Sequence, residues 1–213
     1  MHLLIVAKRP LPGKAKTRLM PAFGPDGSAA LAAAALADTF AAAAGCRADR
    51  VVVSFDGDPT GIVPDAFEVV PQRSGPFDVR LAGAWDDAGG PGLQIGMDTP
   101  QVTPALLDAA LDQLEADGTD AVLGPAVDGG WWAIGLQRPD PEVFLGVPMS
   151  TAETGRRQHE RLVERGLATR LLPELTDVDE PIDVAVVAAA APGTRFAEVA
   201  AELGADRRTG ATR

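Results

Sequence analysis

The sequence predicts an α/β fold with three layers, in which helices cover both faces of a mixed, mostly parallel β-sheet. Apolar runs of strand length alternate with helix-like segments along the chain, which is typical of such folds. Turn-rich stretches of Gly, Pro and Asp separate the segments, and 213 residues suffice for a full core. With no internal repeat or linker, we expect one domain over residues 1–204 and a polar, disordered tail over residues 205–213.

Seven apolar runs are predicted to form the sheet. The run at residues 3–7 begins almost at the first residue and is expected near the centre of the sheet. The run at residues 131–136 follows a glycine-rich loop and is expected to be the antiparallel member. The predicted strands cover residues 3–7, 51–55, 67–70, 93–97, 121–123, 131–136 and 167–172.

Helices are predicted between these strands from their capping signals. Asp26 or Ser28 is expected to cap the first one, which is rich in alanine and ends at Gly45. Thr103 precedes a proline at the first position of another, and Ser150 with Glu153 forms a capping-box pattern. The predicted helices cover residues 26–45, 77–87, 103–116 and 150–164, a segment after Pro181, and residues 195–203.

Composition excludes several classes of function. A net charge of −11 argues against nucleic acid as a partner, because phosphate contacts need basic surface. The single cysteine, Cys46, cannot form an internal disulfide and fits a reducing compartment, so we expect a cytoplasmic protein. The first apolar run, at residues 3–7, is too short for a signal peptide, and no membrane span is expected. With only two histidines, a metal would be bound by oxygen ligands, which favours Mg²⁺ or Mn²⁺.

The most concentrated positive charge lies in the loop after the first strand. The only three lysines of the chain fall between residues 8 and 18, and no acidic residue precedes Asp26. A solvated basic loop is the simplest alternative. However, ligands bind at the carboxyl ends of strands in open α/β sheets, and prolines with Gly13 fix the path of this loop. The loop matches neither the Walker A pattern nor the dinucleotide-binding glycine pattern, so side chains would have to hold a nucleotide's phosphates. The candidates are Lys8, Lys14, Lys16 and Arg18.

Carboxylates follow later segments of the chain. Asp98 comes just after a predicted strand, where it could reach a phosphate-bound metal ion or simply cap the turn that follows. Asp177 and Asp179 precede Pro181. Helix capping explains one of them, and Asp179 could join Asp98 on one divalent cation.

A glycine-rich loop carries another carboxylate, Asp128. The glycines that follow, Gly129 and Gly130, let the backbone approach a ligand closely. Trp131 and Trp132 come next and could form the wall of a sugar or base site. Because neighbours on a strand point to opposite faces, core packing is the favoured role for Trp132.

Four segments together resemble the small glycosyltransferase-A-like (GT-A) proteins of the DUF2064, or rSAM/selenodomain-associated transferase, type. The resemblance implies the nucleotide-diphospho-sugar transferase fold, shared with molybdenum-cofactor and phospholactate nucleotidyltransferases. The chain departs from the family at Trp131 and Trp132, where a tyrosine is usual, and matches its glycine-rich stretch only loosely over residues 72–80. The matching segments are residues 7–19, 95–100, 123–136 and 177–181.

The resemblance also implies roles for individual residues. Asp98 and Asp179 would bind Mg²⁺ or Mn²⁺, and the basic loop would face the phosphates. Asp128 would be the general base that deprotonates the acceptor, and Lys14 would stabilise the departing diphosphate. The predicted nucleotide-binding residues are Lys8, Lys14, Lys16, Arg18 and Asp56, and the predicted acceptor residues are Asp128, Gly129, Gly130 and Trp131.

The function expected from these features is a metal-dependent transferase with a nucleotide or nucleotide-sugar donor and a small-molecule acceptor. A glycosyltransferase is the first expectation, and it would release a nucleoside diphosphate. The alternatives are a guanylyl- or cytidylyltransferase that releases pyrophosphate, and a module that binds a nucleotide without turnover.

Overall fold

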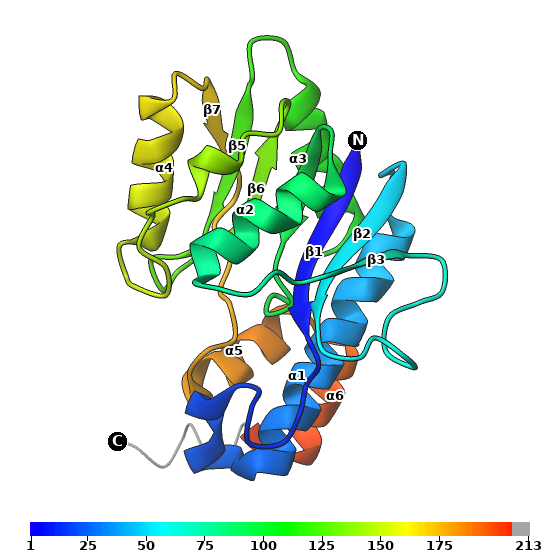
Figure 1. Cartoon of the computed structure of the whole chain (residues 1–213). Coiled ribbons are helices and arrows are strands. Elements are labelled where there is room, and N and C mark those ends of the chain that lie inside the picture. Colours follow the sequence, from blue (N-terminus) through cyan, green and yellow to red (C-terminus); the bar gives the residue numbers. More distant parts are fainter. Residues whose placement is uncertain (206–213) are drawn as a thin grey trace.

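The fold is that of a computed structural model, which describes residues 1–205. A seven-stranded sheet has the order β3-β2-β1-β4-β6-β5-β7 (Figure 1). Only β6 runs antiparallel to its neighbours, β4 and β5, as the sequence predicts. The strands are β1 (His2–Lys8), β2 (Arg50–Asp56), β3 (Glu68–Pro71), β4 (Gly92–Ile95), β5 (Ala121–Pro125), β6 (Trp131–Leu136) and β7 (Thr169–Leu171).

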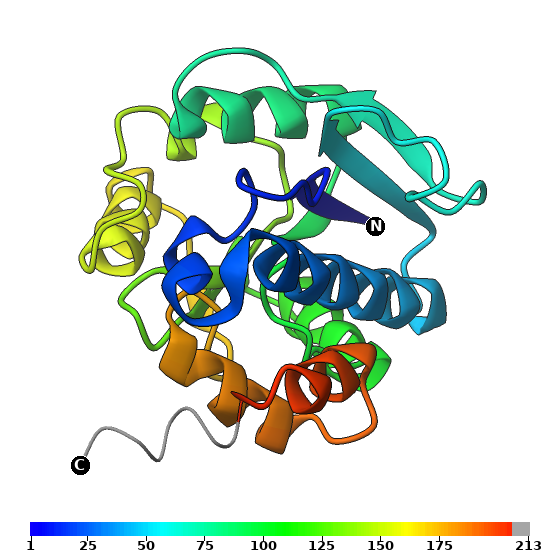
Figure 2. The same ribbon diagram turned by 90° about the horizontal axis from the view of Figure 1, so that it is seen from below.

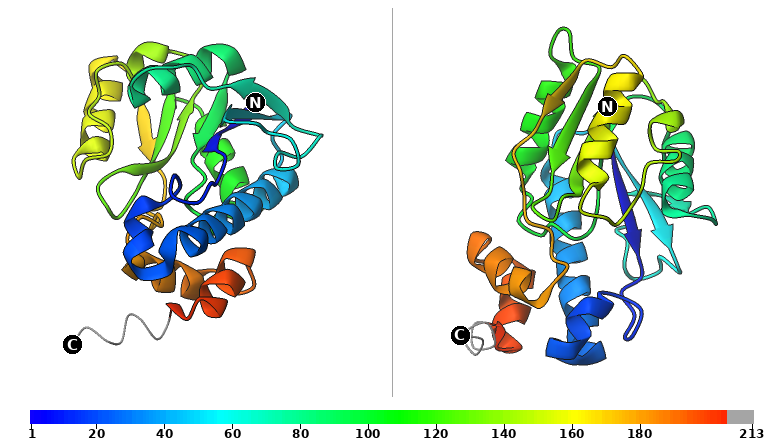
Figure 3. Two further views of the ribbon diagram at one scale, coloured as in Figure 1. Left: turned by 60° about the horizontal axis from the view of Figure 1, so that its bottom comes forward. Right: turned by 90° about the vertical axis from the view of Figure 1, so that its left-hand side faces the viewer.

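Helices pack on both faces of the sheet, which gives the predicted three layers. Helices α1 and α3 cover one face, α2 and α4 cover the other, and α5 with α6 pack against α1 (Figures 2 and 3). The helices are α1 (Met20–Gly45), α2 (Phe77–Ala88), α3 (Pro104–Glu115), α4 (Thr154–Glu164), α5 (Pro181–Ala190) and α6 (Arg195–Glu202), with short 3-10 turns η1 (Thr17–Leu19) and η2 (Pro141–Val143).

The core is divided by the sheet into two large clusters. On one face, Leu3 and Ile5 of β1 pack with Leu36 and Phe40 of α1. On the other face, Leu4 lies in a cluster that includes the fully buried side chain of Trp85. A third cluster joins α1 to α5 and α6. Because side chains alternate along β1 between two buried faces, this strand is a continuous apolar run in the sequence.

Two predicted helix starts are wrong. Helix α1 begins before residue 26, with a break at Gly24, whose φ of 70° is not helical. Ser28 lies inside the helix, buried, and its hydroxyl donates to the Gly24 carbonyl instead of accepting from an amide. Ser150 and Glu153 form no capping box. Instead, the Thr154 hydroxyl accepts a hydrogen bond from the Thr151 amide just ahead of α4.

Helix α1 is also the one helix of the described residues that is long and apolar enough to cross a bilayer. The helical segment is Thr17–Gly45, and 67% of its 18-residue apolar window is buried within the fold. It packs on the sheet, α3 and α6, which is the environment of a core helix. Of the predicted polar tail, only Ala205 lies within the described residues, and it is buried rather than disordered. Residues 206–213 lie outside the described part.

Candidate functional site

A cavity of about 780 Å³ opens at the carboxyl ends of the parallel strands. The chain leaves β1 for β2 and β3 on one side and returns to β4 on the other, so a crevice forms between the ends of β1 and β4. The segments after β1, β4 and β5 line it, together with residues 149–154 and 176–183. The volume lies within the usual range of about 300–1,000 Å³ for small-molecule sites.

The basic loop supplies every cation of the described residues that lines this cavity. Lys8, Lys14, Lys16 and Arg18 all contribute to the lining. Backbone bonds from the amides of Lys14 and Ala15 to the Leu11 carbonyl fold the loop back on itself. Ala15 is buried, which anchors the loop between Lys14 and Lys16.

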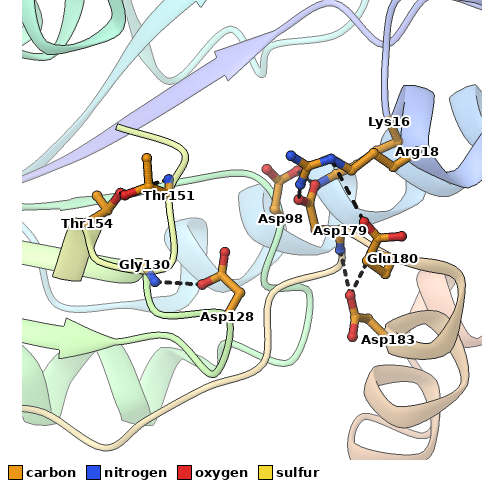
Figure 4. A network of polar contacts seen from close by, with 10 residues as sticks. All are labelled: Lys16, Arg18, Asp98, Asp128, Gly130, Thr151, Thr154, Asp179, Glu180 and Asp183. Atoms are coloured by element: carbon orange, nitrogen blue, oxygen red, sulfur yellow. Dashed lines mark hydrogen bonds and ion pairs between the residues drawn. The ribbon is translucent and has the colours of Figure 1, made fainter. Parts of the chain in front are cut away.

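Lys16 lies between two carboxylates from distant parts of the chain. Its Nζ is 3.0 Å from Oδ1 of Asp98 and 3.7 Å from Oδ1 of Asp179, and Arg18 also pairs with Asp179 (Figure 4). The Lys16 backbone has a φ of 47°, in the left-handed region that residues with a Cβ seldom adopt. Such strain at a polar cluster is typical of functional sites.

The main chain brings the two carboxylates together. The amide of Val178 donates to the Asp98 carbonyl at 2.9 Å, which ties the segment before α5 to the end of β4. Capping of α5 falls to Glu180 and Asp183, which form a capping box, and Asp183 Oδ2 accepts from the amides of Asp179 and Glu180. The Asp179 carboxylate is therefore free of a capping role and faces Lys16 and Arg18. In the described residues, no turn amide donates to the Asp98 side chain either.

Asp128 lies apart from this cluster, on the turn between β5 and β6 (Figure 4). Its Oδ1 accepts a 2.7 Å hydrogen bond from the Gly130 amide. The turn packs backbone to backbone on the start of α4, where the Gly155 amide donates to the Gly129 carbonyl at 2.8 Å. A Cβ at Gly129 would collide with the Ala152 carbonyl oxygen, and the φ of Gly129 is 88°. These contacts hold Asp128 in place from behind.

Asp177 is a site residue that the sequence analysis did not select. It lines the cavity, and burial together with the nearby charge of Asp128 raises its pKa from 3.8 to about 6. A carboxyl group with a raised pKa in a cleft is a candidate for proton transfer. The sequence signal was the pair Asp177 and Asp179 before Pro181, but the burial that distinguishes Asp177 comes only from the fold.

The two adjacent tryptophans have different surroundings. Trp132 is buried, and its Nε1 donates to the Pro173 carbonyl at 2.9 Å, so it packs in the core as predicted. Trp131 is half-buried, lines the cavity and packs near Phe144.

Two of the predicted site residues do not line the cavity in the described structure. Asp56 pairs with Lys8 in the strand register, but β2 lies on the far side of β1 from the cavity. Gly129 lies behind the wall, against Ala152. A further cation of the loop, Arg9, turns away and donates to the Asp58 carbonyl at 2.7 Å.

Asp98 and Asp179, the two carboxylates beside Lys16, fit a metal site whose remaining ligands a substrate would supply. The described residues contain no group of three or more His, Cys, Asp or Glu side chains placed to hold a metal. Mg²⁺, however, commonly takes only one or two carboxylates and fills its other positions with phosphate oxygens and water. Asp98 and Asp179 are oxygen donors that converge on one positive charge, the Lys16 ammonium.

The strand order reverses between β1 and β4, and the site lies at this topological switch point. The sheet order and the position of the site define the protein's fold as that of the nucleotide-diphospho-sugar transferases. The model of DUF2064, described as an uncharacterized protein conserved in bacteria, matches residues 28–151. The chain therefore belongs to the DUF2064 family.

Solved structures agree with this fold. A provisionally named nucleotide-diphospho-sugar transferase from Desulfovibrio desulfuricans G20 is similar over 98% of this chain and 96% of that one, with 26% identity and a TM-score of 0.86. CMP:2-keto-3-deoxy-manno-octonic acid synthetase in complex with CTP is similar over 94% of this chain and 99% of that one, with 13% identity and a TM-score of 0.59. Rv0371c of Mycobacterium tuberculosis H37Rv in complex with manganese is similar over 84% of this chain and 91% of that one, with 18% identity and a TM-score of 0.50. The curated proteins contain no match to the chain.

Proposed function

We propose that the protein is a metal-dependent glycosyltransferase that transfers the sugar of a nucleotide-diphospho-sugar to a hydroxyl group of a small acceptor. The observation that carries the proposal is the cavity at the switch point, where four cations face the end of β1 and two carboxylates converge beside them. The likeness to the Desulfovibrio protein supports the same donor class.

The donor's diphosphate would lie against the basic loop. Lys8 and Lys14 are exposed and form no ion pair within the described residues, so both are available to phosphate oxygens. Lys16 and Arg18 already neutralise carboxylates and would share their charge with the diphosphate. Four cations at the leaving group stabilise the negative charge that develops as it departs.

The acceptor would bind beside Asp128. In the transfer, the acceptor's oxygen attacks the anomeric carbon and its proton passes to a carboxylate, for which Asp128 is the candidate. The bond from the anomeric carbon to the diphosphate oxygen breaks, and the diphosphate leaves with the electron pair. Asp177, beside Asp128, can accept a proton above about pH 6, where it is ionised.

A divalent cation held by Asp98 and Asp179 would add positive charge at the diphosphate. The manganese complex of the similar Rv0371c structure supports a divalent cation in this fold. The predicted choice between Mg²⁺ and Mn²⁺ stays open in this proposal.

A nucleotidyltransferase is the second candidate. The likeness to the synthetase with bound CTP favours it, as does a lysine-rich loop that could neutralise three phosphates. In that reaction an acceptor attacks the α-phosphate of a nucleoside triphosphate, and pyrophosphate leaves.

Calorimetry of nucleoside diphosphate binding with and without Mg²⁺ or Mn²⁺ tests the proposed site. Wild type should bind in a metal-dependent manner, and Asp98→Asn should lose that dependence. Asp65→Asn, which removes the same charge from an exposed residue outside the cavity, is the matched control. Metal-independent binding in all three proteins would contradict the metal role, and no binding of any nucleotide would contradict the proposed function.

A further inference from the structure

The cavity lining is divided by charge. All four cations come from residues 8–18, whereas six carboxylates come from later segments. Asp98 and Asp179 are paired with Lys16 and Arg18. Asp128 and Asp177 form no ion pair within the described residues, and neither do Lys8 and Lys14. The cavity therefore has one end with free cations and another with free carboxylates.

The sheet separates these two ends. Lys8 ends β1 and Asp128 follows β5, with β4 and β6 lying between those strands. Three strand spacings of about 4.8 Å place the two strand ends about 14 Å apart. In the view of Figure 4, Asp128 lies between Thr151 and Thr154 on one side and Asp98 with Lys16 and Arg18 on the other. A diphosphate on the lysines thus leaves the acidic end for the second substrate.

The acidic end is lined by uncharged groups besides its carboxylates. Trp131 offers part of an aromatic ring, and Ser150 and Thr151 offer hydroxyl groups. Tryptophan faces and short hydroxyl side chains suit a ring or chain that carries hydroxyl groups. The Lys16 charge reaches Asp177, but Lys16 is already paired with Asp98 and Asp179.

We propose that the acceptor is a hydroxyl-bearing compound without phosphate or carboxylate groups, bound between Asp128, Asp177 and Trp131. This inference rests on the proposed function, since it assigns the end of the cavity that the donor does not fill. A phosphorylated acceptor would meet two free carboxylates, and the cation whose charge acts on Asp177, Lys16, is already paired with Asp98 and Asp179. Like charges at short range in a cleft repel strongly. A neutral polyol or an amine-bearing acceptor would meet only favourable partners.

Pyrophosphate is the probe for the basic end, because it carries the diphosphate without a base or a sugar. Glucose 6-phosphate is the probe for the acidic end. Calorimetry first measures pyrophosphate binding in the presence of Mg²⁺. Glucose 6-phosphate is then titrated into protein saturated with pyrophosphate. We expect pyrophosphate to bind and the sugar phosphate to give no second binding event.

A charge variant separates repulsion from poor fit. Asp128→Asn keeps an oxygen for the Gly130 amide but removes one of the two repelling charges. In pyrophosphate-loaded protein, this variant should bind glucose 6-phosphate at least threefold more tightly than Asp65→Asn, which makes the same change in net charge outside the cavity. Equal affinities in the two variants would overturn the charge argument.

The outcomes distinguish failure of the acceptor inference from failure of the proposed donor site. Glucose 6-phosphate that binds alongside pyrophosphate in wild type overturns the inference and leaves the proposed donor site intact. A protein that binds no pyrophosphate overturns the donor site itself. Exclusion of the sugar phosphate from wild type, relieved in Asp128→Asn, supports an acceptor without phosphate.

Discussion

Lys16 Nζ lies 3.0 Å from Asp98 Oδ1, across 82 residues of sequence, and its side chain is only 11% exposed. Lys16 lies in the loop after β1, where its backbone is left-handed, and Asp98 follows β4. The contact therefore joins the segments that follow two neighbouring strands. The ammonium occupies the position where two carboxylates converge. It acts there as a built-in counter-ion, and a metal ion would compete with it for the same oxygens.

Removal of this ammonium should therefore strengthen metal binding in the absence of nucleotide. In Lys16→Met, Asp98 and Asp179 lose a shared positive charge and attract a divalent cation in its place. We expect Mn²⁺ to bind on the order of tenfold more tightly, which is about 1.4 kcal/mol. Electron paramagnetic resonance of free Mn²⁺ measures this directly. Unchanged affinity would mean that the two carboxylates do not form a cation site.

Two cations of one loop provide a matched comparison. Lys14 lines the cavity, whereas Arg9 turns away to the Asp58 carbonyl. Lys14→Ala should weaken nucleotide binding by about 1.5–3 kcal/mol, the usual worth of a charge-assisted hydrogen bond. Arg9→Ala removes the same charge and should leave affinity nearly unchanged. If both variants weaken binding equally, calorimetry will have shown a general charge effect rather than a phosphate site.

The turn that carries Asp128 should not tolerate a side chain behind it. In Gly129→Ala, the added Cβ would meet the Ala152 carbonyl oxygen, and the φ of 88° is unfavourable as well. We expect a loss of unfolding free energy of about 2–4 kcal/mol. Gly61→Ala shares the positive φ, at 72°, but has open space around it, so it should lose only about 1 kcal/mol. Denaturant unfolding of the two variants separates collision from backbone strain, and equal losses would show that the packing behind Asp128 is loose.

His2 should make stability depend on pH, far from the site. Burial, followed by the nearby charge of Arg50, lowers its pKa from 6.5 to about 4. The folded protein then resists protonation while the unfolded chain accepts it. The contribution of neutral His2 to the free energy of unfolding is therefore full above pH 6.5 and is lost as pH falls toward 4. At pH 5 the loss should be on the order of 1–2 kcal/mol.

His2→Phe is the control for this pH effect, because it keeps a ring against Trp85 that cannot be protonated. Its denaturation midpoint should fall less between pH 7 and pH 5 than that of wild type. Parallel changes in both proteins would assign the acid sensitivity to other groups.

Most of the sheet could be predicted because its strands are short apolar runs bounded by glycine, proline and aspartate. Trp131–Leu136 was predicted at its observed bounds, whereas the end of β4 was placed too late because Met97 is apolar yet follows the strand. The start of α1 was missed because Gly24 interrupts the helix without ending it. The true start, at Met20, lies before the run of alanines, in a stretch whose two prolines and glycine are typical of a loop.

The site could be predicted as a set of residue types but not as a set of contacts. The lysine cluster and Asp98 stand out in the sequence by position alone. The pairing of Lys16 with Asp98 and Asp179 depends on the hydrogen bond from the Val178 amide to the Asp98 carbonyl, which only the fold reveals. Asp56 was predicted to bind the nucleotide, but it lies on the other side of β1 from the cavity, which only the strand order reveals.

Product analysis by phosphorus NMR shows whether the protein transfers a sugar from a nucleotide-diphospho-sugar. The protein is incubated with Mg²⁺ or Mn²⁺, a set of nucleotide-diphospho-sugars and a set of unphosphorylated polyols and amino sugars. We expect release of a nucleoside diphosphate together with a glycosylated, phosphate-free acceptor, and loss of both in Asp128→Asn. Release of pyrophosphate from a nucleoside triphosphate, with a sugar phosphate as acceptor, would contradict it.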